Sequence, residues 1–93
     1  MSRYIMVGKY SSEAIDEISS NRTEKAIRLI RELGGDVNVM YAVLGGFDLL
    51  LIVDFPKVET AMKASLGLAM LTGISFATYP VVNISDFDNI LAK

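Results

Sequence analysis

The sequence predicts an α+β domain of the ferredoxin-like type, in which two helices cover one face of a four-stranded antiparallel sheet. Three observations predict it. The elements follow in the order β-α-β-β-α-β, the first and third strands are apolar on both faces, and a proline interrupts the fourth strand. The 93 residues have the length of one domain, which we take to span residues 1–93.

Four apolar runs are predicted to form the strands. Residues 3–9 and 47–55 carry apolar side chains on both faces, as is typical of central strands. Residues 36–44 and 74–82 form the other two. Right-handed crossovers put the first and third strands in the middle, so the predicted order is 4-1-3-2. Pro80 fits the edge position of the fourth strand, where a missing N–H is tolerated.

Capping residues and glycines are expected to delimit the helices. Asn21, with Glu24 three residues on, predicts the start of the first long helix, and Gly34-Gly35 its end. Pro56 is predicted to open the second long helix, and Gly73 to close it. Its core-facing stripe is predicted to comprise Val58, Ala61, Met62, Leu66, Ala69 and Met70. A last short turn is expected to begin at Ser85.

The hairpin between the second and third strands decides which side chains share a face. A two-residue turn at Gly45-Gly46, with φ > 0 at both glycines, places Tyr41 opposite Leu50. The helix-free face then has Lys9 with Asp48 at one end, Arg3 with Asp54 at the other, and an apolar middle. That middle consists of Ile5, Val7, Val39, Tyr41, Leu50 and Ile52.

Such an apolar face needs a cover. Apolar residues make up 52% of the chain, which is more than one small core requires. A second copy is the simplest cover, and we expect at least a homodimer in which two helix-free faces pack into a dimeric α+β barrel.

The composition excludes several classes of function. The chain contains no Cys and no His, so thiolate chemistry and the commonest transition-metal ligands are missing, and we expect no transition-metal site and no cofactor. A net charge of −2 argues against a nucleic-acid partner. The nearly uncharged stretch 64–74 is shorter than the ~20 residues of a membrane-spanning helix. The start shows no signal-peptide pattern, so we expect a cytoplasmic protein.

Several of these residues, taken in order, resemble the GYD-domain family. They are Gly34-Gly35, Tyr41, the run Leu44-Gly45-Gly46-Phe47-Asp48, Pro56 and Gly73. Arg22 stands where that family tends to carry an arginine before its long helix. Phe47 replaces a tyrosine that the family favours, and Gly46 replaces a polar residue. The resemblance extends from Tyr4 to about Val82, and implies a ferredoxin-like fold related to dimeric α+β barrels, with no defined activity.

Asp48, Lys9, Tyr41 and Tyr4 are the candidate ligand-binding residues. Asp48 follows the hairpin on a mainly apolar face, where an ionised carboxylate needs a partner. It either anchors a ligand, or accepts turn N–H groups or pairs with a lysine. Lys9 either contributes to an anion site or forms an ion pair. The amphipathic rings of Tyr4 and Tyr41 suit a pocket, an interface or a core.

Four functional interpretations remain open. The first is a homo-oligomeric binding or assembly protein with a small, mostly apolar ligand. The second is an enzyme similar to the cofactor-independent monooxygenases among dimeric α+β barrels, for which Asp48, Lys9 and the tyrosines are the available polar groups. An RNA-binding module shares the element order but needs basic residues that are missing here. An amino-acid-binding regulatory domain also fits the topology.

Overall fold

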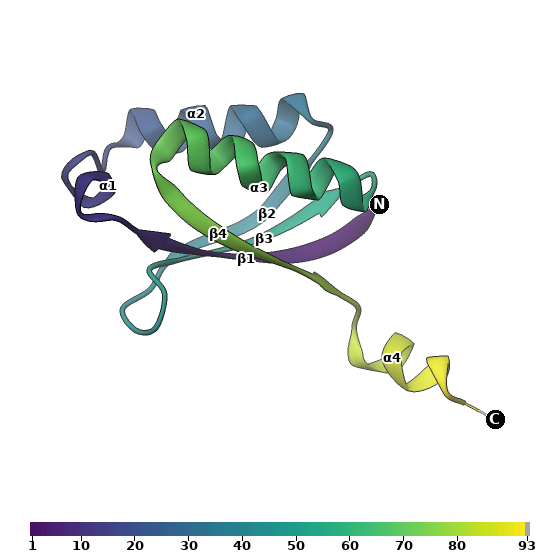
Figure 1. The fold of residues 1–93 in the computed structure, drawn as a ribbon. Coiled ribbons are helices and arrows are strands. Elements are labelled where there is room, and N and C mark those ends of the chain that lie inside the picture. Colours follow the sequence, from purple (N-terminus) through teal and green to yellow (C-terminus); the bar gives the residue numbers. More distant parts are fainter. Residues whose placement is uncertain (93) are drawn as a thin grey trace.

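Four strands and four helices follow one another in residues 1–92, the part of the chain that this computed structural model describes (Figure 1). Their bounds are β1 (Ser2–Tyr10), α1 (Ser12–Asp16), α2 (Ser20–Glu32), β2 (Asp36–Ala42), β3 (Leu49–Phe55), α3 (Val58–Thr72), β4 (Ile74–Val81) and α4 (Ile84–Ile90).

The strands form one antiparallel sheet in the order β2-β3-β1-β4. This is the predicted order 4-1-3-2 read from the other edge, so the sequence-based topology is confirmed. Pro80 lies on the edge strand β4, opposite Tyr4 of β1. Its missing N–H therefore leaves no gap in the interior of the sheet.

Helices α2 and α3 lie side by side on one face of the sheet, and the other face carries no helix over its centre (Figure 1). The core fills the space between these two layers. Met6, Leu51, Val53 and Phe55 point into it from β1 and β3, and Ile30 and Leu68 from the two helices. The two helices are in contact at Gly67 of α3, where a Cβ would lie at the ordinary van der Waals distance of 3.4 Å from a methyl group of Leu29 of α2.

The start of α2 differs from the prediction. Ser19, not Asn21, is the N-cap: its backbone is extended, and its hydroxyl accepts the N–H of Arg22 at 3.1 Å. Asn21 already lies inside the helix. The serine pair that precedes Asn21 offered an equally good capping side chain. The end is as predicted, since Gly34 has a left-handed φ of 81°.

Helix α3 shows the largest departure from the sequence-based expectation. It begins at Val58 with Lys57 as N-cap, so Pro56 lies just outside it. The buried residues are Ala61, Ala64, Leu68 and Thr72. Four residues that were expected in the core are exposed: Val58, Met62, Leu66 and Met70. The helix is apolar over most of its circumference, so hydrophobic periodicity alone does not determine which side faces the sheet.

The β2–β3 connection is wider than the predicted two-residue turn. Gly45 and Gly46 do not have positive φ; Gly34 and Gly73 are the glycines with positive φ within residues 1–92. The Val43 N–H donates to the Asp48 carbonyl at 2.9 Å, which closes a loop over residues 44–47. The predicted register is nevertheless confirmed, because Tyr41 lies opposite Leu50.

Helix α4 projects from the body past the end of β4 (Figure 1). Asn83, not Ser85, is its N-cap, with a side-chain oxygen that accepts the Asp86 N–H at 2.8 Å. None of its residues is buried. No helix within residues 1–92 is long and apolar enough to cross a membrane.

Candidate functional site

The helix-free side of the sheet carries a continuous apolar surface, which we call the open sheet face. Strand registers bring its members together: Val7 pairs with Leu50 and Ala77, and Ile5 pairs with Ile52 and Tyr79. The eight residues of the face are Ile5, Val7, Val39, Tyr41, Leu50, Ile52, Ala77 and Tyr79.

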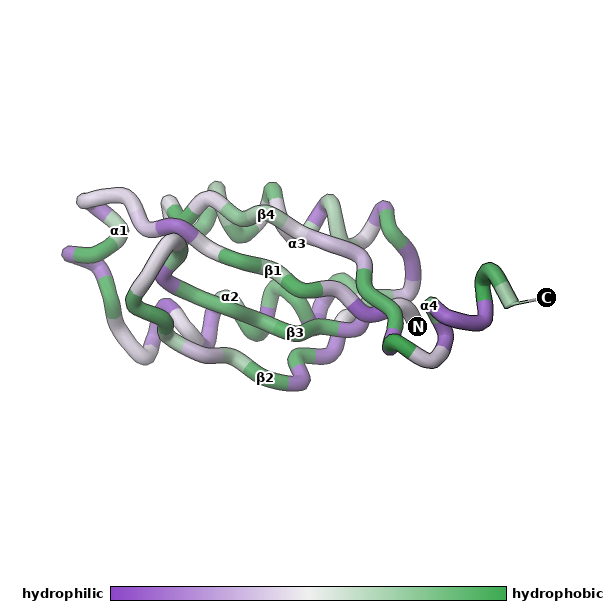
Figure 2. Tube along the Cα trace, turned by 90° about the horizontal axis from the view of Figure 1, so that it is seen from below, coloured by the Kyte–Doolittle hydropathy of each residue, from purple (hydrophilic) through white to green (hydrophobic). Residues whose placement is uncertain are grey.

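Figure 2, which views the molecule from this side, shows hydrophobic residues along the middle of β1 and β3 and hydrophilic residues toward the strand ends. No helix covers this surface, and Tyr41 and Tyr79 are more than half exposed. The expected arrangement of side chains, an apolar middle with charged residues at both ends of the face, is confirmed.

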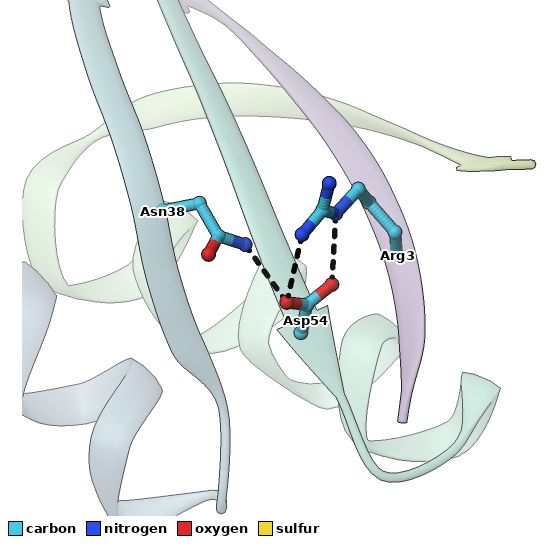
Figure 3. Close-up of polar contacts among 3 residues, drawn as sticks. All are labelled: Arg3, Asn38 and Asp54. Carbon is cyan, nitrogen blue, oxygen red and sulfur yellow. Dashed lines mark hydrogen bonds and ion pairs between the residues drawn. The ribbon is translucent and has the colours of Figure 1, made fainter. Parts of the chain in front are cut away.

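Arg3, Asp54 and Asn38 close one end of the open sheet face (Figure 3). The Arg3 guanidinium donates to both carboxylate oxygens of Asp54, at 3.0 and 3.3 Å. A register shift between Val37 and Val39 leaves Asn38 as the extra residue of β2, and its amide donates to Asp54 at 2.9 Å. Hydrogen bonds from Arg3 and then Asn38 hold the pKa of Asp54 below its ordinary value. The predicted pairing of Arg3 with Asp54 is therefore present.

Asp48 and Lys9 lie at the opposite end of the same face, each with a backbone partner. The Asp48 carboxylate accepts the Tyr10 N–H at 2.9 Å. The Lys9 ammonium donates to the Gly46 carbonyl at 3.4 Å. The Asp48 carboxylate is thus an acceptor, but for an N–H of β1 and not for turn N–H groups, and it helps to anchor the loop to β1. Within residues 1–92 it forms no ion pair with Lys9.

The four candidate ligand-binding residues do not form one cluster. Asp48, Lys9 and Tyr41 belong to the open side of the sheet, whereas Tyr4 points to the helix side and is 3% exposed. The Tyr4 ring packs against Phe55, with ring centroids 5.9 Å apart. Tyr4 is therefore a core residue in this chain.

A small cavity lies on the other side of the sheet, between β1, β3, β4 and the helices. Its volume is about 40 Å³, and its apolar walls include Ala26, Leu51, Leu68 and Phe76. Arg22, which also lines this cavity, is the positively charged residue of its wall. This guanidinium lies 5.5 Å from the centroid of the Tyr10 ring and donates to the Ala14 carbonyl.

Sequence analysis noted Arg22 only through the resemblance and did not single out Tyr10. The available signal was the resemblance, which placed an arginine just before the long helix. The structure gives that arginine a local role, because it joins the α1 backbone to a ring on β1. Within residues 1–92, no group of three or more acidic side chains is arranged to hold a metal ion.

Comparison with known proteins identifies the family. The model of the GYD domain matches residues 4–91. The chain belongs to the GYD domain family. No curated protein sequence matches this GYD domain.

One similar solved structure is the leucine response regulatory protein LrpA of Mycobacterium tuberculosis. The TM-score is 0.59 at 8% sequence identity, and the match covers 88% of this chain. It covers 51% of the LrpA chain, so the GYD domain corresponds to about half of that protein. At this identity the similarity concerns the fold, and it supports the ferredoxin-like assignment.

Proposed function

We propose that this GYD domain is a self-associating module whose open sheet face packs against the same face of a second copy. The observation that carries the proposal is the face itself: eight apolar residues from all four strands, contiguous and free of any helix. An apolar surface of this extent is typical of an interface. Two such faces packed together form the closed dimeric α+β barrel.

The distribution of charge supports a two-fold arrangement. The charged side chains lie at the ends of the face, and the ionised groups of Arg3 and Asp54 are already paired within one copy. Packing two faces therefore requires no unpaired charge at the centre of the interface, where desolvation costs most. A stable interface of this kind buries more than about 1,000 Å² in total.

A charged substitution on the face tests the proposal. Val7 lies at the centre, and its side chain points away from the core, so Val7→Lys is compatible with a folded single copy. Leu66→Lys places the same charge on the exposed side of α3 and is the matched control. In sedimentation velocity at micromolar concentration, we expect the wild type and Leu66→Lys at twice the 10.2 kDa of one chain, and Val7→Lys as a single chain. A monomeric wild type, or a Val7→Lys variant that still dimerises, contradicts the proposal.

A small apolar ligand is the second candidate function, and the cavity beside Arg22 is where it would bind. The apolar walls favour such a ligand. The volume of about 40 Å³ is far below the roughly 150 Å³ of an engineered cavity that takes up benzene, so a ligand must be very small or must widen the site. Native mass spectrometry of the purified protein tests this function, and a mass that equals the bare chain or its multiples opposes it.

The monooxygenase alternative receives less support than self-association. An enzyme of that kind needs reactive polar groups around an apolar pocket. Of the polar residues considered for such an enzyme, Lys9 and Asp48 do not line the cavity and bind backbone atoms, and Tyr4 packs in the core. The geometry of the open sheet face therefore favours assembly as the function.

A further inference from the structure

Two parts of the chain project beyond the sheet on its helix-free side, one at each end. Figure 1 shows the β2–β3 loop below one end of the sheet and α4 below the other end. The loop follows the end where Gly8 pairs with Leu49 and Phe76, and α4 follows the end where Arg3 pairs with Val81. A second copy seated on the open sheet face would lie between these two projections.

Both projections present apolar side chains to solvent. Leu44 at the tip of the loop is fully exposed. Four apolar residues at three- and four-residue spacing, three on α4 and one at its C-cap, fall on one side, and each is more than half exposed. They are Ile84, Phe87, Ile90 and Leu91. An amphipathic helix of seven residues without tertiary support is marginal in water, so this side needs a partner surface.

We propose that α4 and the β2–β3 loop form a reciprocal clasp. In it, α4 of each copy packs against Leu44 in the β2–β3 loop of the other copy. The inference rests on the proposed self-association and specifies its geometry. Two faces can be related by a two-fold axis that runs along the strands or across them. An axis along the strands brings like ends of the two sheets together, so that the α4 end of one copy meets the α4 end of the other. An axis across the strands brings unlike ends together, so that each α4 meets the partner's loop.

Charge and shape favour the axis across the strands. Helix α4 carries two carboxylates, Asp86 and Asp88. The loop end of the sheet carries the exposed ammonium of Lys9, and the Asp48 carboxylate beside it already accepts a backbone N–H. Bringing unlike ends together sets these opposite charges near each other, whereas like ends would bring four α4 carboxylates together. Like ends would also direct both α4 helices into the same space. Unlike ends give each α4 the exposed Leu44 as an apolar contact.

Disulfide trapping tests the clasp directly, because the chain has no cysteine of its own. The variant Leu44→Cys/Phe87→Cys places one thiol on each projection. The two positions lie at opposite ends of a molecule 52 Å long, so a disulfide within one chain, which needs Cα atoms closer than about 7 Å, cannot form. After mild oxidation we expect most of this variant to run as a covalent dimer on a denaturing gel.

Two control variants define the geometry. Leu44→Cys/Leu66→Cys moves the second thiol to the exposed side of α3, and we expect it to stay a single chain on the gel. Phe87→Cys alone is also expected to stay uncrosslinked, since the clasp keeps the two α4 helices apart. A covalent dimer of Phe87→Cys alone would show like ends together and overturn the clasp.

Sedimentation of the same samples separates the two proposals. A Leu44→Cys/Phe87→Cys variant that dimerises without crosslinking overturns the clasp and leaves self-association through the face standing. A wild type that is monomeric in the same experiment overturns both. As an independent measurement, Phe87→Asp is expected to raise the dimer Kd at least tenfold, and an unchanged Kd overturns the clasp.

Discussion

Arg3 and Asp54 face each other across β1 and β3 and make two hydrogen bonds, at 3.0 and 3.3 Å, at one end of the open sheet face. Asn38 adds a third hydrogen bond to the same carboxylate. The group of three joins the three strands β2, β3 and β1 where the apolar middle of the face ends.

This arrangement predicts a pH dependence of stability. The folded protein holds the pKa of Asp54 below its ordinary value, so the carboxylate contributes stability that is complete above about pH 4 and is lost as the pH falls through the lowered pKa. The free energy of unfolding of the wild type should therefore fall toward that of Asp54→Asn as the pH is lowered from about 4. Urea unfolding of both proteins across this range measures it. A difference that stays constant or widens on acidification contradicts the role of Asp54.

Asp48 is predicted to act on stability through the Tyr10 N–H. Asp48→Ala leaves that donor without its side-chain acceptor and should lower the free energy of unfolding by about 1–3 kcal/mol. Asp48→Asn keeps an acceptor oxygen and should lower the free energy of unfolding by clearly less. Chemical denaturation of the two variants distinguishes this role from that of a ligand anchor, for which both substitutions would leave stability unchanged.

The orientation of α3 predicts a contrast between two leucines. Leu68 is 1% exposed and Leu66 is 68% exposed. Leu68→Ala should lower the free energy of unfolding by about 2–5 kcal/mol through the cavity that it leaves. Leu66→Ala should change it by less than about 0.5 kcal/mol, as is usual for surface positions. If both substitutions cost the same, α3 does not face the sheet as described.

Sequence pattern was sufficient for the topology of the sheet. The central strands are apolar on both faces because one face of β1 and β3 packs into the core under the helices and the other forms the middle of the open sheet face. Pro80 is accommodated at an edge of the sheet. Six of the eight residues of the open sheet face were predicted, with Tyr41 opposite Leu50, because side chains alternate along a strand. Ala77 and Tyr79, which β4 adds to the face, were not predicted. The predicted features depend on local periodicity, which a single sequence displays.

Other features depend on contacts that periodicity does not display. The buried side of α3 is selected by the fit of Ala61, Ala64 and Leu68 to the sheet, while the exposed side is equally apolar. The Asp48 carboxylate accepts a backbone N–H from β1, a strand that is distant from it in the sequence. The packing of Arg22 over Tyr10 likewise needs the α1–α2 turn to be in place.

The most direct test of the central claim is an isotope-filtered NOE spectrum of a dimer made from equal amounts of labelled and unlabelled chains. This experiment detects only contacts between copies. We expect intermolecular NOEs among the methyl groups of Val7, Leu50 and Ile52 on the open sheet face, and none from the core methyls of Ile30 or Leu68. A dimer whose intermolecular NOEs arise from the exposed side of α3, with none from the open sheet face, would contradict it.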